Sequence, residues 1–71
     1  MPKQNNHMNR IQEILEEKGV SKAELARLLH KSKGTITLYT SNQVQPPIPV
    51  LFEIAKILNT DPRKLLDITH Q

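Results

Sequence analysis

The basic side chains of this 71-residue chain are concentrated in its middle third. Residues 18–45 contain five lysine or arginine residues and one glutamate, which gives this segment a charge of +4. Residues 1–17 have a net charge of −1, and residues 46–71 have three basic and three acidic side chains. A local excess of positive charge suits the binding of phosphate groups, but a solvated helix face can have the same composition. Charge alone favours neither interpretation.

Histidine and cysteine are the next residues that could do chemistry, because both ligate metals. His7, His30 and His70 are far apart, and neither an H-x-x-x-H nor an H-x-x-E-H spacing occurs. The chain has no cysteine, which excludes a disulfide framework and a thiolate metal site. The sequence therefore predicts no metal ion, and the histidines are interpreted as surface residues.

The acidic and hydroxyl side chains do not form a catalytic pattern. Glu13, Glu16 and Glu17 have the spacing of a solvated helix face rather than of a catalytic pair. Ser21 and Ser32 are not part of any motif that makes serine a nucleophile. The only two glycines are too few for a phosphate-binding loop. Since so short a chain also leaves little room for a deep pocket, we expect neither an enzyme nor a cofactor.

Length and composition indicate one ordinary globular domain. Residues 1–8 are predicted to be a flexible tail, residues 9–68 the domain and residues 69–71 a second short tail. No apolar run approaches the roughly 18 residues of a membrane span, and residues 1–8 lack the apolar stretch of a secretory signal. We therefore expect a cytoplasmic protein without a membrane partner.

Periodicity and capping signals predict the first two helices. The first covers residues 9–18, with Asn9 as N-cap and Gly19 in the left-handed position after its end. The second covers residues 21–29 and starts with a capping box, S-x-x-E, at Ser21 and Glu24. The predicted buried stripes are Ile11, Ile14 and Leu15 in the first helix and Leu25, Leu28 and Leu29 in the second.

A third helix is predicted over residues 32–41, with Ser32 as its N-cap. Ile36 and Tyr39 are three residues apart, so they should face the core together. Gly34 on the opposite side is a poor helix former, which costs about 1 kcal/mol relative to alanine. Packing gives no reason for a glycine there, whereas close approach of another molecule would.

Two further helices are predicted after a polar, proline-bearing loop over residues 42–48. The fourth helix has Pro49 in its first turn, and the fifth starts at Asp61 and Pro62 as N-cap and first residue. Their apolar positions are Leu51, Ile54, Ala55 and Leu58 in the fourth helix and Leu65, Leu66 and Ile68 in the fifth. No alternation typical of strands is sustained, so the predicted fold is all-α, a compact five-helix bundle.

Residues 21–41 have the layout of a helix-turn-helix, with two capped helices joined by a three-residue turn. The segment SKAELARLLHKSKGTITLY, followed by NQVQPP and LFEIAKIL, resembles the phage Cro/repressor-like (XRE) helix-turn-helix family. The resemblance covers residues 9–68. It depends on the capping box, the small Ala26, the turn, a T-I-x-x-Y third helix, the proline-bearing loop and an L-x-x-I-A-K-x-L fourth helix. It implies a five-helix bundle that binds operator DNA, usually as a symmetric dimer.

The resemblance also implies which residues contact DNA: the start of the second helix, the exposed face of the third and the loop that follows. The predicted DNA-binding residues are Ser21, Lys22, Lys31, Ser32, Lys33, Gly34, Thr35, Thr37, Leu38, Asn42, Gln43 and Gln45. Lysines and helix N-termini suit phosphate oxygens. Lys33 could instead donate to guanine, Thr37 could reach a base edge, and Leu38 could pack on a thymine methyl group.

The chain departs from the family pattern at three places. His30 replaces the usual glycine of the turn, where a left-handed residue is expected at a cost of about 1 kcal/mol. Leu15 and Thr40 replace an arginine and a glutamate that pair in many members, and both partners are missing together. Pro47 replaces the serine that usually caps the fourth helix. None of these positions lies on the exposed face of the third helix that is predicted to contact DNA, here called the reading face.

The function predicted from these patterns is sequence-specific binding of double-stranded DNA by a transcriptional regulator. The simplest form is a repressor that acts as a homodimer on a near-palindromic operator. One alternative is an antitoxin that binds its own promoter and grips a toxin protein through residues 1–8 or those after Leu66. A second alternative is a protein-interaction module without DNA binding, which docks through Phe52 and Ile57 or through Ile68.

Overall fold

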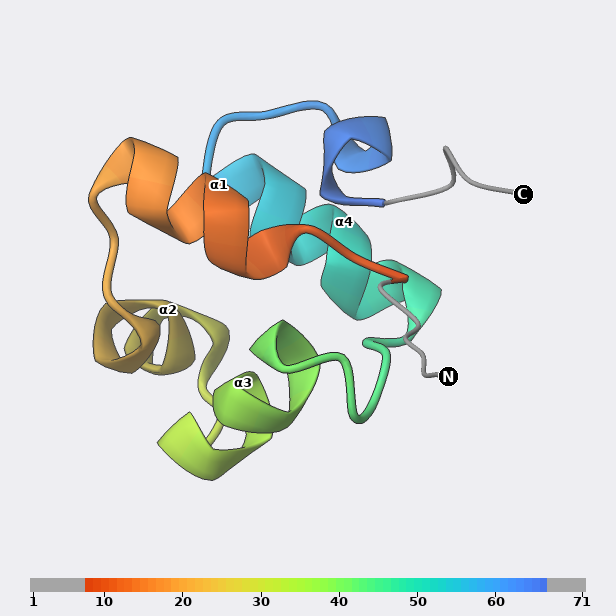
Figure 1. Ribbon diagram of the computed structural model, residues 1–71. Helices are drawn as coiled ribbons and strands as arrows, with labels where there is room; N and C mark the ends of the chain where they lie inside the picture. The colour runs from red at the N-terminus through yellow and green to blue at the C-terminus, as the bar shows by residue number, and fades with distance from the viewer. Residues whose placement is uncertain (1–7, 67–71) are drawn as a thin grey trace.

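The computed structural model describes residues 8–66, which form four α-helices and a short 3-10 helix (Figure 1). They are α1 (Ile11–Lys18), α2 (Lys22–Leu29), α3 (Lys33–Thr40), α4 (Ile48–Ile57) and the 3-10 helix η1 (Pro62–Leu65). The predicted all-helical class is confirmed, but the five-helix count is wrong, because the last element is not an α-helix. Apart from Met8, the predicted tails lie outside the described residues, as do His7, Ile68 and His70.

The end of η1 explains this correction. Leu66 has extended backbone angles, with φ −103° and ψ 146°. The Leu65 carbonyl accepts a hydrogen bond from the Arg10 N–H at 2.7 Å, and Leu66 forms an antiparallel bridge with Asn9. A carbonyl that continued an α-helix would be bonded four residues later in the chain. The chain therefore pairs with the segment before α1 instead of extending the helix.

The start of α1 differs from the prediction by one residue. A cap at Asn9 would place the first helical residue at position 10, but α1 begins at Ile11, with Arg10 in the cap position and no side-chain cap. Asn9 is only 2% exposed. Its Oδ1 accepts from the Ile11 N–H at 3.1 Å, and its Nδ2 donates to the Tyr39 carbonyl at 2.9 Å. The Asn9 amide thus joins two distant parts of the chain.

One apolar core holds the helices together. In Figure 1, α1 and α4 lie above α2 and α3, and η1 closes against α4. Leu28 was predicted to be buried but is 40% exposed, and Ala26 at 4% takes its place beside Leu25 and Leu29. Residues at i, i+1 and i+4 share one helix face, so a small alanine there lets α2 lie close to its neighbours. The buried hydrophobic residues are Ile11, Ile14, Leu15, Leu25, Ala26, Leu29, Ile36, Tyr39, Leu51, Ile54, Ala55, Leu58 and Leu65.

None of the described helices is long and apolar enough to cross a membrane.

Candidate nucleic-acid interface

The turn between α2 and α3 has the predicted left-handed residue. His30 follows α2 with φ 58° and ψ 41°. Its N–H donates to the Arg27 carbonyl at 3.2 Å, and the Lys31 N–H donates to the Ala26 carbonyl at 2.9 Å. These two bonds satisfy carbonyls at the end of α2 and turn the chain into α3. The glycine usual at this position is therefore not essential for the turn.

Both helices of the motif are capped by the predicted serines. Ser21 Oγ accepts from the Glu24 N–H at 3.1 Å, and Ser32 Oγ accepts from the Thr35 N–H at 3.1 Å. The second half of the predicted capping box does not form, because the Glu24 carboxylate pairs with Arg27 at 2.6 Å instead. Ser32 Oγ also shares a hydrogen bond of 2.9 Å with Thr35 Oγ1. The capping serines therefore set the direction of each helix start, and Thr35 belongs to the cap of α3.

The two sides of α3 are clearly different. Ile36, Tyr39 and Thr40 are buried, at 0%, 6% and 7% exposure. The opposite side exposes the predicted reading residues. These are Lys33, Gly34, Thr37 and Leu38, together with Ser41, which extends the same row by one turn. The prediction from sequence did not include Ser41, although its i+4 spacing from Thr37 could have indicated it.

Gly34 is not required by the packing of the protein. A Cβ atom added there would meet only Ser32 Oγ, at an ordinary contact distance of 3.8 Å. Gly34 has no positive φ, unlike Gly19, which ends α1 with φ 72°. An alanine would therefore fit and would favour the helix. The glycine leaves the surface of α3 low at its N-terminal end, where the first N–H groups of a helix have no partner inside it.

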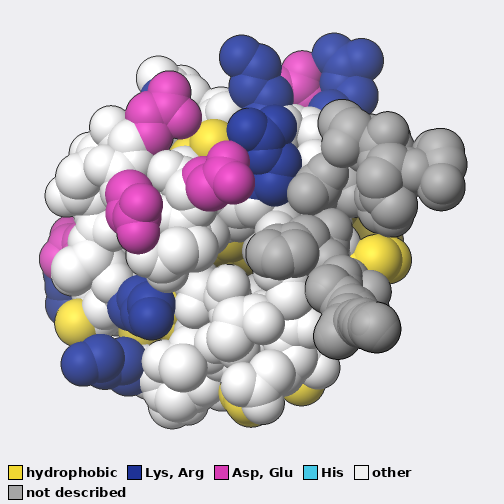
Figure 2. Space-filling model, viewed as in Figure 1, with side chains coloured by type: hydrophobic (Ala, Val, Ile, Leu, Met, Phe, Trp, Pro, Cys, Tyr) yellow, Lys and Arg dark blue, Asp and Glu magenta, His cyan; other side chains and the backbone are white. Residues whose placement is uncertain are grey.

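The lysines beside this face have no acidic partner in the described part of the chain. All three ion pairs within residues 8–66 use arginine, among them the pair of Arg27 with Glu24. Lys31 and Lys33 are exposed and Lys22 is half-buried. Figure 2 shows acidic side chains over the part of the surface formed by α1 and none over the lower part of this face, where α3 lies. The helix-turn-helix thus presents uncompensated cations, which suit a polyanion.

The side chains of the loop after α3 bond to the protein itself. Asn42, in a left-handed conformation with φ 64°, accepts with Oδ1 from the N–H groups of Met8 and Asn9 at 2.9 and 2.8 Å. Gln45 Oε1 accepts from Asn9 Nδ2 at 2.8 Å, and Gln43 Nε2 donates to Ser41 Oγ at 3.0 Å. The predicted loop residues therefore lie beside the end of α3, but with their amides engaged. The structural role of Asn9 was not predicted, since no local pattern indicates a partner 30 or more residues away.

The described residues contain no group of side chains arranged to hold a metal ion. No three histidine, aspartate or glutamate side chains of residues 8–66 come together as ligands.

Comparison with known proteins identifies the motif. A family model described as helix-turn-helix matches residues 11–65. The crystal structure of a Bacteroides fragilis protein that is proposed to bind DNA superimposes with a TM-score of 0.84. The two chains are 40% identical, and the match covers 84% of this chain and 97% of the other. No protein of curated function matches the chain. The resemblance seen in the sequence is thereby confirmed, and the chain belongs to the XRE-type helix-turn-helix family.

Proposed function

We propose that this protein binds a specific sequence in double-stranded DNA, with α3 in the major groove, and that it regulates transcription by occupying that site. The observation that carries the proposal is the composition of the exposed face of α3. It combines a cation at Lys33, a glycine that packing does not require and two side chains suited to base edges. A helix face that only met water would gain from a better helix former than Gly34.

Phosphate contacts are assigned to the start of α2 and to the turn. Lys22 and Lys31 can each neutralise a phosphate, and the N–H groups behind Ser21 and Ser32 can donate to phosphate oxygens. Binding through such contacts releases counterions, so we expect affinity to fall steeply as salt is added. An affinity that hardly changes between low and moderate salt would contradict this assignment.

Base contacts are assigned to the exposed side of α3. Lys33 can donate to O6 or N7 of guanine, Thr37 can bond to a base edge, and Leu38, which is 39% exposed, can pack on a thymine methyl group. Each good base contact discriminates against a wrong base by about 1–3 kcal/mol. Three such positions make a short recognition sequence in each half-site.

The loop residues are expected to contribute less to DNA affinity than the residues of α2, the turn and α3. Asn42, Gln43 and Gln45 already bond within the protein, so contact with a phosphate requires them to exchange an internal bond for one to DNA. We expect them to add less affinity than the lysines, because an exchanged hydrogen bond gives little net free energy.

Two copies are proposed to bind together as a repressor. Half-sites one helical turn apart, at about 34 Å, would place both copies on one face of the duplex and would make the operator near-palindromic. A domain of this kind blocks transcription by occupying the DNA.

Selection of bound sequences from a pool of random duplexes, at moderate salt, tests the proposal. We expect a near-palindrome with two half-sites. Lys33→Ala should relax the preference at one base pair, whereas Lys22→Ala should weaken all sequences alike and lower the salt slope by about 1. A pool that stays random, with binding that vanishes at moderate salt, would overturn the proposal.

The two alternatives stay predictions. The segments proposed to grip a toxin lie outside the described residues, except for Met8, and a toxin-like reading frame beside the gene is the check. For the interaction module, Phe52 is 57% exposed, whereas Ile57 is partly buried and packs against the core. The exposure of Phe52 is compatible with DNA binding as well, since it lies on α4 and not on the reading face.

A further inference from the structure

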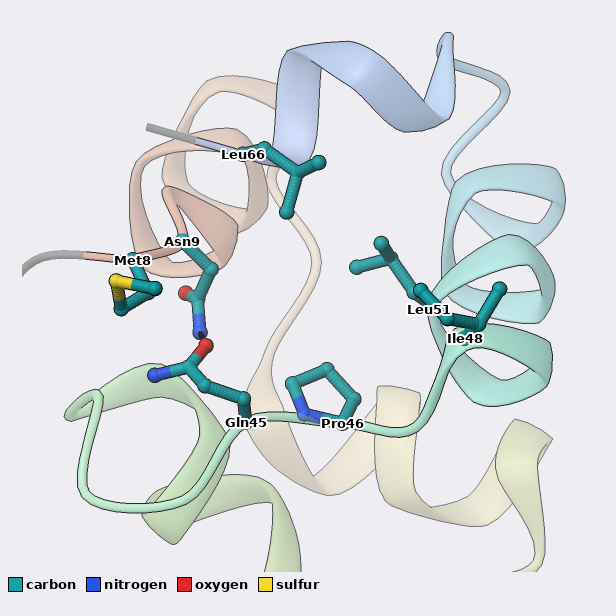
Figure 3. Close-up of a pocket in the computed structure, with 7 residues that line it drawn as sticks. All are labelled: Met8, Asn9, Gln45, Pro46, Ile48, Leu51 and Leu66. Carbon is teal, nitrogen blue, oxygen red and sulfur yellow. Dashed lines mark hydrogen bonds between the residues drawn. The ribbon is translucent and has the colours of Figure 1, made fainter. Parts of the chain in front are cut away.

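Two features that the proposed function does not use are an apolar groove beside α4 and the side chain of His30. The groove has a volume of about 280 Å³ (Figure 3). Its apolar lining consists of Met8, Pro46, Ile48, Leu51 and Leu66, and no ionisable side chain lines it. His30 is different, because histidine is the side chain whose charge ordinarily changes between pH 5 and pH 8. It is the only histidine among residues 8–66.

The imidazole of His30 contributes nothing to the turn that its backbone forms. The turn is held by backbone hydrogen bonds, from the His30 N–H to the Arg27 carbonyl and from the Lys31 N–H to the Ala26 carbonyl. A left-handed backbone costs a residue with a side chain about 1 kcal/mol, which a glycine avoids. The His30 side chain is exposed and takes part in none of the three ion pairs within residues 8–66. The fold therefore gives no reason for an imidazole at this position.

His30 lies next to the groups that are proposed to hold phosphates. Lys31, a proposed phosphate contact, is the next residue in the chain. Ser32, which caps α3, is two residues away, so the Cα atoms of His30 and Ser32 are at most about 7 Å apart. Charges at physiological salt interact over about 8 Å before they are screened. A cation on His30 would therefore act on a phosphate held by Lys31 or by the start of α3.

The charged groups around the turn leave a protonated imidazole without an acidic partner in the described part of the chain. On the helices that flank the turn, the ionisable side chains are Lys22, Glu24, Arg27, Lys33 and the buried Tyr39. The helix α4, which packs against α2, adds Glu53 and Lys56. Glu24 pairs with Arg27 at 2.6 Å, and neither Glu24 nor Glu53 pairs with His30. A DNA phosphate would supply the missing negative charge.

We propose that His30 is a pH-dependent phosphate contact, whose protonated imidazole donates a hydrogen bond to a DNA phosphate beside the one held by Lys31. The inference rests on the proposed function and adds a form of regulation to it. A phosphate favours the charged imidazole, so binding takes up a proton. DNA affinity therefore rises as the pH falls from about 8 to about 6, where more of the free protein already has the proton.

The affinity for the selected operator at pH 8 and at pH 6, at one salt concentration, tests this inference. We expect the wild type to bind about 5–10-fold more tightly at pH 6, at the lower end of the usual coupling between two ligands. His30→Asn suits a left-handed backbone but has no charge, so its affinity should be the same at both pH values. His30→Gly is a second neutral variant and should behave in the same way. His30→Lys has a permanent charge and should bind tightly at both pH values.

Two results of this experiment have different meanings. Wild-type affinity that does not change with pH, or a rise that persists in His30→Asn and His30→Gly, would overturn this inference alone. Absence of operator binding at both pH values would overturn the proposed function and, with it, the inference.

Titration calorimetry in buffers of different ionisation enthalpy measures the proton directly. Near pH 7 we expect the wild type to take up a proton on binding, at most about one per chain, and His30→Asn to take up almost none. His7→Gln combined with His70→Gln removes the two other histidines of the chain and is the matched control, which should keep the uptake. Equal uptake by the wild type and His30→Asn, or loss of uptake in the double variant, would overturn the inference.

Discussion

At its N-terminal end, α3 is capped by Ser32, whose bonding partner Thr35 is three residues away. At its C-terminal end, the Tyr39 carbonyl accepts a hydrogen bond from Asn9, which is 30 residues away in the sequence. The first contact can form in an isolated turn, whereas the second needs the folded chain. The end that starts the reading face is thus locally defined, and the end that leads to the loop depends on tertiary structure.

The largest expected effect is at the tertiary end. Asn9→Ala removes the acceptor of the Ile11 N–H and the donor to the Tyr39 carbonyl, and it leaves buried groups without partners. We expect the free energy of unfolding in urea to fall by about 2–3 kcal/mol. A loss within about 0.5 kcal/mol, typical of surface changes, would show that both ends of α3 are locally defined.

Two substitutions by glycine, at Asn42 and at Asn59, separate the contribution of the Asn42 side chain to stability from that of its left-handed backbone. Asn42 and Asn59 both have positive φ values, 64° and 55°, but only the Asn42 amide binds distant backbone groups within the described residues. Asn42→Gly should lower stability by about 1–2 kcal/mol, because the N–H groups of Met8 and Asn9 lose their acceptor. Asn59→Gly should change it by only a few tenths. Equal effects would mean that the amide network adds nothing.

The local end should be less sensitive. Ser32→Ala removes the cap of α3, and we expect a loss of about 1 kcal/mol in thermal or urea unfolding. Ser32→Asn retains a capping oxygen and serves as the control, with stability near that of the wild type. If Ser32→Ala costs more than Asn9→Ala, the comparison between the two ends is reversed.

Gly34 is expected to give an effect of opposite sign. Gly34→Ala should raise the free energy of unfolding by about 0.5–1 kcal/mol, since alanine favours the helix and meets no obstacle. The same change should weaken binding to the selected operator, because a methyl group would stand between α3 and DNA. Higher stability together with unchanged affinity would show that Gly34 is not there for DNA.

The smallest effect is expected at a third local cap, Asp61. The Asp61 carboxylate accepts hydrogen bonds from the Arg63 side chain and, with a smaller effect, from the Arg63 backbone N–H. These bonds lower the pKa of the Asp61 carboxyl from 3.8 to about 2. A lowered folded pKa gives stability that is present above the ordinary pKa and is lost as the pH falls through about 2. The Tm difference between wild type and Asp61→Asn should therefore be small at neutral pH and should close between about pH 4 and pH 2. A difference that stays constant over this range would contradict the linkage.

Local patterns identified most of the helix starts. Ser21, Ser32 and Asp61 act as caps where the sequence predicted them, and His30 has the left-handed conformation expected of the turn. Each of these features depends on residues within a few positions of one another, so a single turn of chain contains the whole cause. The roles assigned to the twelve DNA-binding residues remain predictions, although the structure places Lys33, Gly34, Thr37 and Leu38 on one exposed face.

Other features could not be predicted because the local pattern allowed more than one outcome. Leu28 fits a helical stripe, but the position of the neighbouring helices leaves it 40% exposed. Glu24 fits a capping box, yet Arg27 lies close enough to take its carboxylate. In the first case, the packing of the helices decided which side chain is buried. In the second, a competing ion pair decided the partner of the carboxylate.

By itself, the sequence determined the helical class, the helix-turn-helix and the side of α3 that faces outward, because periodicity and capping act within one or two turns. Tertiary structure alone decided that Asn9 joins α1, α3 and the loop, and that the chain after Leu65 pairs with it rather than forming a fifth helix. It alone decided that a groove opens beside Ile48. These contacts join segments 30 or more residues apart, and hydrogen-bonding groups at such distances meet only when the core has brought the helices together.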